Sequence, residues 1–198
     1  MARDMGPVLK KCRSLGIEPS YLGIDKKSNR KNARAGKKVS EYGLQLREKQ
    51  KAKFIYGVLE KPFRNDFEKA KKLKFGTTGE NLMILLELRL DNVVFRAGMA
   101  RTRMEARQIV DHKHVTVNGK CVNIPSYQCK VGDVIEIKEK HKGDQRYKDI
   151  VAATDGRVTP AWLSANLETL SATINEKPSR ESIDVPVNEM LIVELYSK

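Results

Sequence analysis

The strongest constraint on the fold lies in residues 88–137, where the signals of two short helices are followed directly by those of a small antiparallel sheet. Gly98 follows the first of these helices, at the C-cap position that favours a residue with positive φ. Thr102 and Glu105 have capping-box spacing, which predicts a second helix over about 103–111. The first helix is predicted by apolar residues at helical spacing: Leu82, Leu86, Leu90, Val93, Val94 and Ala97.

Strand signals follow the second helix. Residues 115–117 precede the pair Asn118-Gly119, which suits a two-residue type I′ hairpin, and a return strand is expected near 121–123. A turn at Gly132-Asp133 leads into a further strand over 134–137. This stretch therefore predicts an α+β domain in which a helix-turn-helix accompanies a small antiparallel sheet.

The charges on this stretch point to a polyanion. From Leu88 to Lys113 the acids are Asp91, Glu105 and Asp111. A compact pair of helices can present guanidinium groups to phosphates at fixed spacing. The alternative is that arginines on a short helix are simply solvated. The basic side chains around the turn and the second helix are Arg96, Arg101, Arg103, Arg107, His112 and Lys113.

Charge is distributed unevenly along the 198 residues. The whole net charge of +13 lies in residues 1–75, and the remainder contains as many acids as bases. This asymmetry is typical of a polyanion-binding arm joined to ordinary folded structure, with nucleic acid as the first candidate and a membrane surface as the alternative. No apolar stretch is long enough for a membrane span, and residues 1–21 lack the apolar run of a signal peptide, so we expect a soluble, cytoplasmic protein.

Metal and disulfide chemistry are not expected. Three widely spaced cysteines, Cys12, Cys121 and Cys129, form no CxxC pair and fit neither a disulfide framework nor a zinc site, even with His112 and His114 included. We expect the cysteines to be small, partly buried apolar residues. The two histidines could perform acid-base chemistry, but hydrogen bonding beside Lys113 is their simpler role.

The first half of the chain reads as a basic arm followed by helices. Residues 1–40, with the basic run 25–38, could not bury enough apolar surface to fold alone and are expected to be ordered only by a polyanion; a solubilising tail is the alternative. Ser40 is a candidate N-cap for the next helix. Pro62 is expected to interrupt this helical segment, and another helix is expected over 63–74. Gly76-Thr77-Thr78-Gly79 should end that helix and precede the apolar helix.

Signals beyond residue 137 are weaker. A short helix is expected over 144–153, and Thr159-Pro160 suggests an N-cap followed by proline at the first helical position. Trp162 and Leu163 are expected in the core, and the run SATINEKP suggests a strand. Residues 188–197 could be a helix capped by Asn188 or a strand, and we favour the helix.

Three segments carry a resemblance to a known family: SEYGLQLREKQKAKFIYGVLEKPFRNDFEKA, RLDNVVFRAGMARTRMEARQIVDHKHVTVNGKCVNIPSYQCKVGDVI and VPVNEMLIVELYSK. Together they resemble the S-four family of bacterial small-subunit ribosomal proteins, and the likeness covers nearly the whole chain. The resemblance implies a basic arm over 1–40, a helical domain over 41–87 completed by 177–198, and an RNA-binding α+β domain over 88–176.

The resemblance also implies a function. Members of the family bind the 5′ domain of 16S rRNA early in assembly and contact neighbouring small-subunit ribosomal proteins. They lie near the mRNA entry channel and near the region that governs decoding accuracy. It implies no enzyme activity, no cofactor and no small-molecule substrate. Many members carry a four-cysteine zinc knuckle in the arm; here only Cys12 is present, which implies a zinc-free member whose arm is ordered by RNA. Asp4 stands where an aromatic residue is usual.

The predicted RNA-binding residues come from this likeness and from charge. Those matching the family's second domain, with Lys113 added for its charge, are Arg103, Arg107, Gln108, His112, Lys113 and His114. Those matching the basic face of its first domain are Tyr42, Gln45, Arg47, Lys49, Lys51 and Arg64. Charge adds these others: Arg3, Lys10, Arg13, Lys26, Lys27, Arg30, Arg34, Lys37, Lys38, Lys53, Lys69, Lys71 and Lys72.

Two other classes of protein stay open on the residues alone. A helix-turn-helix can enter the major groove of DNA, whereas on RNA it would grip backbone and shape. An enzyme could carry the same module as an appendage, and Arg89-Leu90-Asp91 is similar to an aspartate motif of pseudouridine synthases. No separate catalytic domain is visible, and we expect Asp91 to pair with a nearby arginine. We also expect removal of Arg107 or of lysines near Lys51 to weaken binding, and Cys121→Ser to affect stability more than binding.

Overall fold

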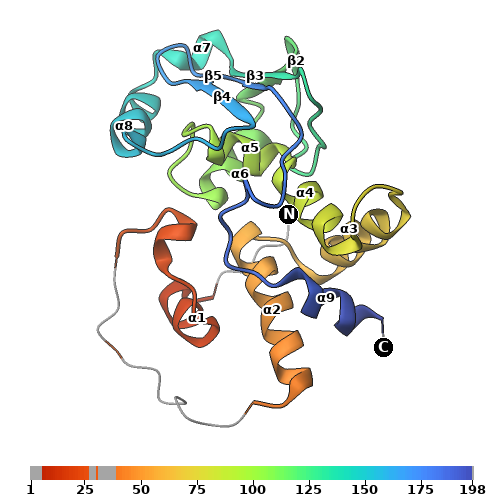
Figure 1. Ribbon diagram of the computed structural model, residues 1–198. Coiled ribbons are helices and arrows are strands. Elements are labelled where there is room, and N and C mark those ends of the chain that lie inside the picture. Colours follow the sequence, from red (N-terminus) through yellow and green to blue (C-terminus); the bar gives the residue numbers. More distant parts are fainter. Residues whose placement is uncertain (1–5, 27–29, 31–38, 198) are drawn as a thin grey trace. The chain divides into compact units, whose positions relative to one another are not determined.

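A computed structural model describes residues 6–26, 30 and 39–197 of the chain (Figure 1). The chain divides into two compact units. Unit 1 comprises Met1–Met83 and Asp184–Lys198, and unit 2 comprises Ile84–Ile183. Unit 1 is helical and unit 2 combines helices with an antiparallel sheet, so the predicted α+β class is confirmed. No helix in the described part of the chain is long and apolar enough to cross a membrane.

Unit 1 is built from helices whose ends are set by local signals. As predicted, α2 begins after Ser40, whose Oγ accepts a hydrogen bond from the Gly43 amide at 3.2 Å. α3 begins earlier than predicted, because Pro62 lies inside its first turn, where a missing N–H group costs nothing. The elements are α1 (Val8–Leu15), a 3-10 turn η1 (Pro19–Leu22), α2 (Glu41–Tyr56), α3 (Glu60–Lys72), the first part of α4 (Thr78–Glu87) and α9 (Glu189–Tyr196).

The C-terminal segment is a helix and completes unit 1, packing along α2 (Figure 1). Asn188 caps α9 by accepting a hydrogen bond from the Met190 amide at 3.1 Å, which confirms the predicted helix. Phe67 of α3 contacts Tyr196 with ring centroids 4.6 Å apart. The start of α4 approaches α9 so closely that a Cβ on Gly79 would lie 2.7 Å from Glu189 Cγ. Sequence-distant residues thus share one small core.

Unit 2 carries a five-stranded antiparallel sheet in the order β2-β1-β3-β5-β4. Asn118 and Gly119 both have positive φ between β1 and β2, as the predicted type I′ hairpin requires, although the return strand covers only two residues. Its elements after α4 are α5 (Leu90–Arg96), α6 (Arg103–Asp111), β1 (Val115–Val117), β2 (Lys120–Cys121), β3 (Val134–Ile137), α7 (Glu139–Lys142), α8 (Gln145–Thr154), β4 (Leu163–Asn166) and β5 (Ser171–Ile174).

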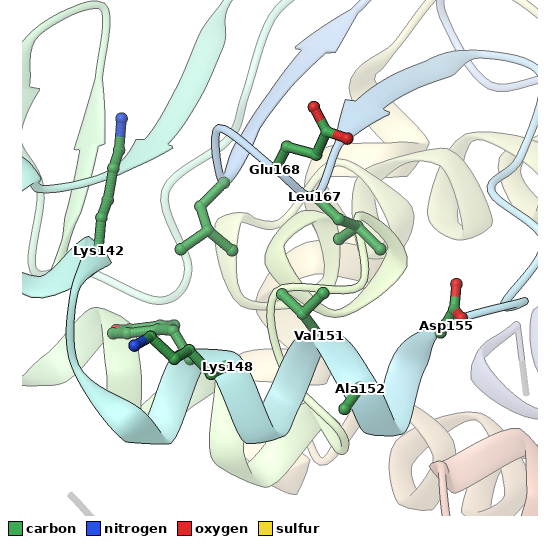
Figure 2. A pocket seen from close by; sticks show the side chains of 9 residues that line it. Lys142, Lys148, Val151, Ala152, Asp155, Leu167 and Glu168 are labelled. Atoms are coloured by element: carbon green, nitrogen blue, oxygen red, sulfur yellow. The ribbon is translucent and has the colours of Figure 1, made fainter.

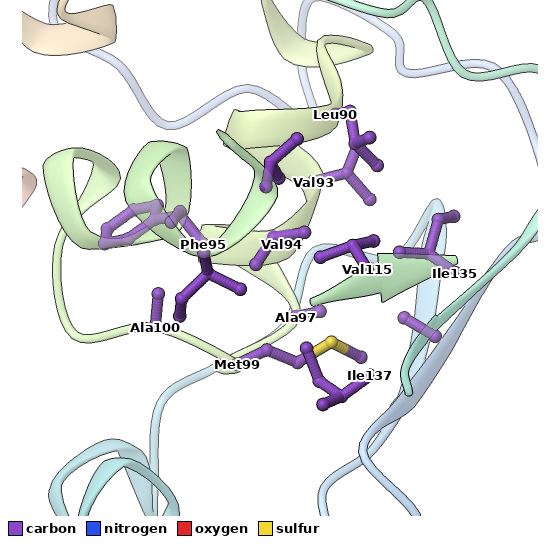
Figure 3. Close-up of a cluster of buried hydrophobic side chains, with 14 of the residues drawn as sticks. Leu90, Val93, Val94, Phe95, Ala97, Met99, Ala100, Val115, Ile135 and Ile137 are labelled. Carbon is purple, nitrogen blue, oxygen red and sulfur yellow. The ribbon is translucent and has the colours of Figure 1, made fainter. Parts of the chain in front are cut away.

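The core of unit 2 lies between the α5–α6 pair and the sheet. Figure 3 shows Val93 and Val94 of α5 near Val115, Ile135 and Ile137 of the strands. The paired positions Val115 and Ile137 are both buried, so alternate side chains of β1 and β3 face the helices. Helices α5 and α6 are therefore held against a rigid surface, which fixes the polar side chains on their outer faces.

The prediction of one long apolar helix up to Ala97 is wrong, because the chain forms two helices, α4 and α5, with a break between them. Arg89 is extended, with φ −67° and ψ 137°. The backbone around it pairs instead with the segment after β2: Leu90 N donates to the Tyr127 carbonyl at 2.9 Å, and Cys129 N donates to the Leu88 carbonyl at 2.9 Å. These long-range hydrogen bonds replace the helical ones. Asp91 consequently lies in the first turn of α5 and not in mid-helix.

The helix suggested at Thr159-Pro160 is also wrong. The chain turns there and enters β4, with the Trp162 carbonyl accepting a hydrogen bond from the Asn175 amide at 3.0 Å. The neighbouring predictions are confirmed: Trp162 and Leu163 are buried, α8 occupies the expected helical segment, and β5 lies in the run SATINEKP.

Candidate nucleic-acid interface

The turn between α5 and α6 is closed by local hydrogen bonds. Thr102 Oγ1 accepts from the Glu105 amide at 3.2 Å, as a capping box requires. The Glu105 carboxylate accepts from the Arg101 amide at 2.9 Å, one residue earlier than the expected Thr102 amide. It also pairs with the Arg101 guanidinium at 3.1 Å, so the exposed Arg101 side chain is tethered at the turn.

Asp91 holds two arginines at the start of α5. Its carboxylate receives Arg89 Nε and Nη2 at 3.1 and 3.0 Å. Arg107, on α6, donates from Nε and Nη2 to Asp91 Oδ2 at 3.0 and 2.6 Å. The expected pairing of Asp91 with a nearby arginine is confirmed. Because Asp91 is buried, these contacts compensate its charge and fix both guanidinium groups.

A second buried carboxylate supports the other arginines. Glu87 accepts from Arg96 Nη2 at 2.8 Å and from Asn92 Nδ2 at 2.6 Å. Asn92 Oδ1 in turn accepts from Arg103 Nε at 2.7 Å, and the Arg103 guanidinium lies 4.2 Å from the centre of the Phe95 ring. Arg103 is buried, and through these contacts it joins α6 to α5.

Arg157 contributes to this turn although nothing in the sequence pattern selects it. Its guanidinium donates to the carbonyls of Phe95, Ala100 and Arg101 at 3.2, 3.1 and 3.0 Å. It thereby satisfies carbonyl groups at the end of α5 and in the connection to α6. No local pattern marks such a residue, because its partners are more than 50 residues away in the chain.

The three histidines gather beside α6. His114 stacks on His141 with centroids 3.8 Å apart and an interplanar angle of 11°, and His112 lies 6.4 Å from His114. Burial lowers the pKa of His114, and the neighbouring charges of His141, Arg146 and His112 lower it further. Burial raises the pKa of Tyr147 to about 12, so its hydroxyl stays protonated and can donate to His114 Nδ1, 2.9 Å away. These contacts suit a neutral, structural imidazole.

On α2 the central lysines are paired within unit 1. Lys49 and Lys53 lie 2.8 and 2.6 Å from the two carboxylate oxygens of Glu60, and Lys51 lies 2.6 Å from Glu48. Gln45 is buried and donates to Glu194 at 3.1 Å. Lys49 and Lys53 therefore join α2 to α3, and Gln45 joins α2 to α9, whereas the Lys51 pair lies within α2.

Other predicted residues extend from the surface. Tyr42 and Arg47 are exposed on α2, and Arg64 on α3, while Arg13 is half-buried and Gln108 and Arg107 are half-buried on α6. Lys69 is exposed and lies 3.3 Å from Asp66. The remaining exposed members of the predicted set are Lys10, Lys26, Arg30, Lys71, Lys72, His112 and Lys113. Five predicted residues lie outside the described part of the chain: Arg3, Lys27, Arg34, Lys37 and Lys38.

The cysteines differ in their surroundings. Cys12 and Cys129 are buried, as predicted, whereas Cys121 is exposed on β2, so the prediction is wrong for that residue. Burial raises the pKa of both the Cys12 and the Cys129 thiols. Within the residues that the structure describes, no three His, Cys, Asp or Glu side chains are grouped as metal ligands.

A pocket of about 580 Å³ lies between α8 and the turn joining β4 to β5 (Figure 2). Val151, Leu167 and other apolar side chains line it. Its charged lining residues are Lys142, Lys148, Asp155 and Glu168. This balance of charge differs from the basic surfaces above, so the pocket is not the place where phosphates would gather.

Comparisons with known proteins agree with this architecture. A family model described as "Ribosomal protein S4/S9 N-terminal domain" matches residues 3–87, and one described as "S4 domain" matches residues 88–135. The chain is 78% identical to small ribosomal subunit protein uS4 of Lachnoclostridium phytofermentans over 198 residues, covering all of both chains. The uS4 proteins of Lachnospira eligens and Agathobacter rectalis are 70% and 69% identical, again over the full length of both chains.

Proposed function

The chain belongs to the uS4 family of small ribosomal subunit proteins, and we propose on this basis that it binds the 5′ domain of 16S rRNA and nucleates assembly of the subunit. As a member it is a structural constituent of the small ribosomal subunit, is not an enzyme and works in the bacterial cytoplasm.

The observation that carries the proposal is the arrangement of arginines on the α5–α6 pair. Two buried carboxylates, Asp91 and Glu87, hold the partly exposed guanidinium groups of Arg107 and Arg96 in fixed positions on a packed scaffold. Such preorganisation lowers the side-chain entropy lost when phosphates are bound. Guanidinium edges held at fixed spacing suit a folded RNA, whose phosphates are also held at fixed spacing.

Unit 1 supplies a second basic surface, formed by exposed side chains on α2 and α3. Arg47, Arg64, Lys71 and Lys72 are exposed and have no ion-pair partner among the described residues. These charges are free to release counterions from RNA on binding. Family membership favours RNA over DNA as the partner. The deep, narrow major groove of an RNA helix excludes a protein helix, so recognition depends on the RNA backbone and its shape.

The proposal includes the protein's place in the subunit. The further partners are neighbouring small-subunit ribosomal proteins and mRNA near the entry channel. A position near this channel would also let the protein contribute to decoding accuracy. These assignments are supported by family membership and by the likeness of the sequence over its full length.

The proposal is tested by a filter-binding titration of the full-length protein against the isolated 5′ domain of 16S rRNA. Transfer RNA and duplex DNA serve as unlabelled competitors, and the titration is repeated across a salt series. Binding that resists both competitors at physiological salt is the expected result. Equal displacement by every polyanion, with loss of binding at moderate salt, would reduce the function to non-specific electrostatic attraction.

A further inference from the structure

The chain segment that joins α3 to α4 places an aromatic ring in solvent. Phe75 is 78% exposed, and Leu73 beside it is 42% exposed. The segment is nevertheless held at both ends. The Leu73 amide donates to the Ala70 carbonyl at 3.2 Å. The Thr77 amide donates to Glu80 Oε2 at 2.9 Å, while the Glu80 amide donates to Thr77 Oγ1 at 3.3 Å.

The conformation of Gly76 allows the chain to turn directly after Phe75. Its φ is +67°, and a Cβ there would lie 2.9 Å from Glu80 Oε2. Glycine therefore permits the tight turn between Phe75 and the capping box of α4. The Phe75 ring projects from an ordered, short connection, and so its exposure is not the result of a frayed end.

Four lysines closely precede the ring in the sequence, and no acid interrupts residues 69–75. All four are exposed: Lys69, Lys71, Lys72 and Lys74. Lys69 lies near the buried Asp66, whereas Lys71, Lys72 and Lys74 have no ion pair within the part of the chain that the structure describes. An exposed apolar side chain alone is common on protein surfaces. An aromatic ring amid unpaired cations is the composition of surfaces that bind single-stranded nucleic acid.

We propose that Phe75 is a stacking site for one unpaired nucleobase of RNA, with Lys71, Lys72 and Lys74 binding the adjacent phosphates. The proposal deepens the proposed function and rests on it. The π-face of a base covers the exposed ring, and the flexible lysine side chains beside it in the sequence bind phosphates of the same strand. A base-paired helix could not supply this ligand, because its bases are already stacked; the site therefore selects a bulge, loop or strand end.

The charge around the ring favours a nucleic acid over a protein segment. A protein partner would need several acidic residues around one apolar side chain to match the lysines, whereas every nucleotide carries both a flat apolar face and an anionic group. The two kinds of contact are also separable, because stacking depends on the ring and the phosphate contacts depend on salt.

The test compares Phe75→Ala, Phe75→Leu and Phe75→Trp in full-length protein, titrated against the 5′ domain of 16S rRNA. Met190→Ala is the matched control, because Met190 is an apolar residue of unit 1 that is 55% exposed but lies beside Glu189. Circular dichroism melting checks that each variant is folded, as expected for a side chain in solvent. The indole introduced by Phe75→Trp also gives a fluorescence signal, measured against the wild-type background from the buried Trp162.

We expect Phe75→Ala and Phe75→Leu to weaken binding at least about fivefold, the lower end of one base–aromatic stack, with an unchanged salt slope. Phe75→Trp should keep the affinity, and RNA should quench its added fluorescence; Met190→Ala should behave as wild type. Full affinity in Phe75→Ala or Phe75→Leu, or no quenching in Phe75→Trp, overturns the stacking site. If the wild type itself shows no preference for this RNA over transfer RNA and DNA, the proposed function fails, and this result is distinct from the failure of the stacking site.

Discussion

Replacing Glu60 by Gln should loosen the attachment of α9 to unit 1. The Glu60 carboxylate lies 2.8 Å from Lys49 Nζ, 2.6 Å from Lys53 Nζ and 3.0 Å from Tyr196 Oη, so it links α2, α3 and α9. Its side chain is 48% exposed, and each ion pair is therefore assigned well under 1 kcal/mol. Adding the hydrogen bond from Tyr196 to a charged acceptor gives a total loss of about 1–2 kcal/mol.

This loss should depend on pH. Burial opposes ionisation of Glu60, but hydrogen bonds from Lys49, Lys53 and Tyr196 outweigh it and lower the pKa from 4.5 to about 2. A carboxyl with a lowered folded pKa stabilises the protein above its unfolded pKa, and this stabilisation is lost as pH falls toward the folded pKa. The difference between wild type and Glu60→Gln should be complete above pH 4.5, and less than about half of it should remain at pH 3.

The assay is hydrogen–deuterium exchange of peptides covering α9, taken as the ratio of variant to wild-type rate at each pH so that intrinsic exchange cancels. The expected ratio at pH 7 is about 5–30, the equivalent of 1–2 kcal/mol. Fluorescence of Trp162, which lies in unit 2, is the internal control and should not change. A ratio near one at pH 7, or the same ratio at pH 7 and pH 3, would show that the Glu60 carboxylate does not hold α9 in place.

Three further predictions concern unit 2 and the thiols. Since the pKa of His114 is lowered from 6.5, stability should be full above pH 6.5 and decrease below it; urea unfolding followed by Trp162 fluorescence should show this decrease, and His114→Gln should reduce it. Arg157→Ala should lower the free energy of unfolding of unit 2 by about 1–3 kcal/mol, because three carbonyls lose a donor; an unchanged urea midpoint would contradict this. Ellman's reagent should modify Cys121 quickly in folded protein and Cys12 and Cys129 only after unfolding, and rapid reaction of three thiols would show that the burial is wrong.

Features set by neighbouring residues were predictable from the sequence. Ser40, Thr102 and Asn188 cap helices at the expected positions, and Asn118-Gly119 forms the expected hairpin turn. In each case the stabilising contact joins residues within three positions of one another, so the information is local. The α+β class followed from the same local signals.

Features set by distant residues were not predictable. The break at Arg89 depends on hydrogen bonds to the segment around Tyr127, which no helical periodicity reveals. Likewise, the charge of Lys49 and Lys53 suggested an RNA-facing surface, but Glu60 on the next helix pairs with both. Charge counts in sequence cannot distinguish a lysine paired within the fold from one facing solvent.

The same distinction determines which variants should weaken RNA binding directly. Arg107 and Lys51 were expected to contribute through their charge, and the structure pairs them with Asp91 and Glu48. Removing Arg107 would leave the buried Asp91 with Arg89 as its remaining arginine partner, and removing Lys51 would take away the ion-pair partner of Glu48. Losses of stability and of binding would therefore be mixed. Exposed basic residues such as Arg47 and Arg64 give a cleaner test of RNA contact.

RNA binding through exposed basic side chains is tested best by the salt dependence of binding to the 5′ domain of 16S rRNA for two triple variants. One neutralises exposed residues, Arg47→Gln, Arg64→Gln and Lys72→Gln; the other neutralises paired residues, Lys49→Gln, Lys51→Gln and Lys53→Gln. The exposed set should lower the slope of log K against log salt by about one for each phosphate that the protein no longer neutralises, without lowering the melting temperature. The paired set should chiefly lower the melting temperature. Wild-type affinity and slope in the exposed variant would contradict RNA binding by this surface.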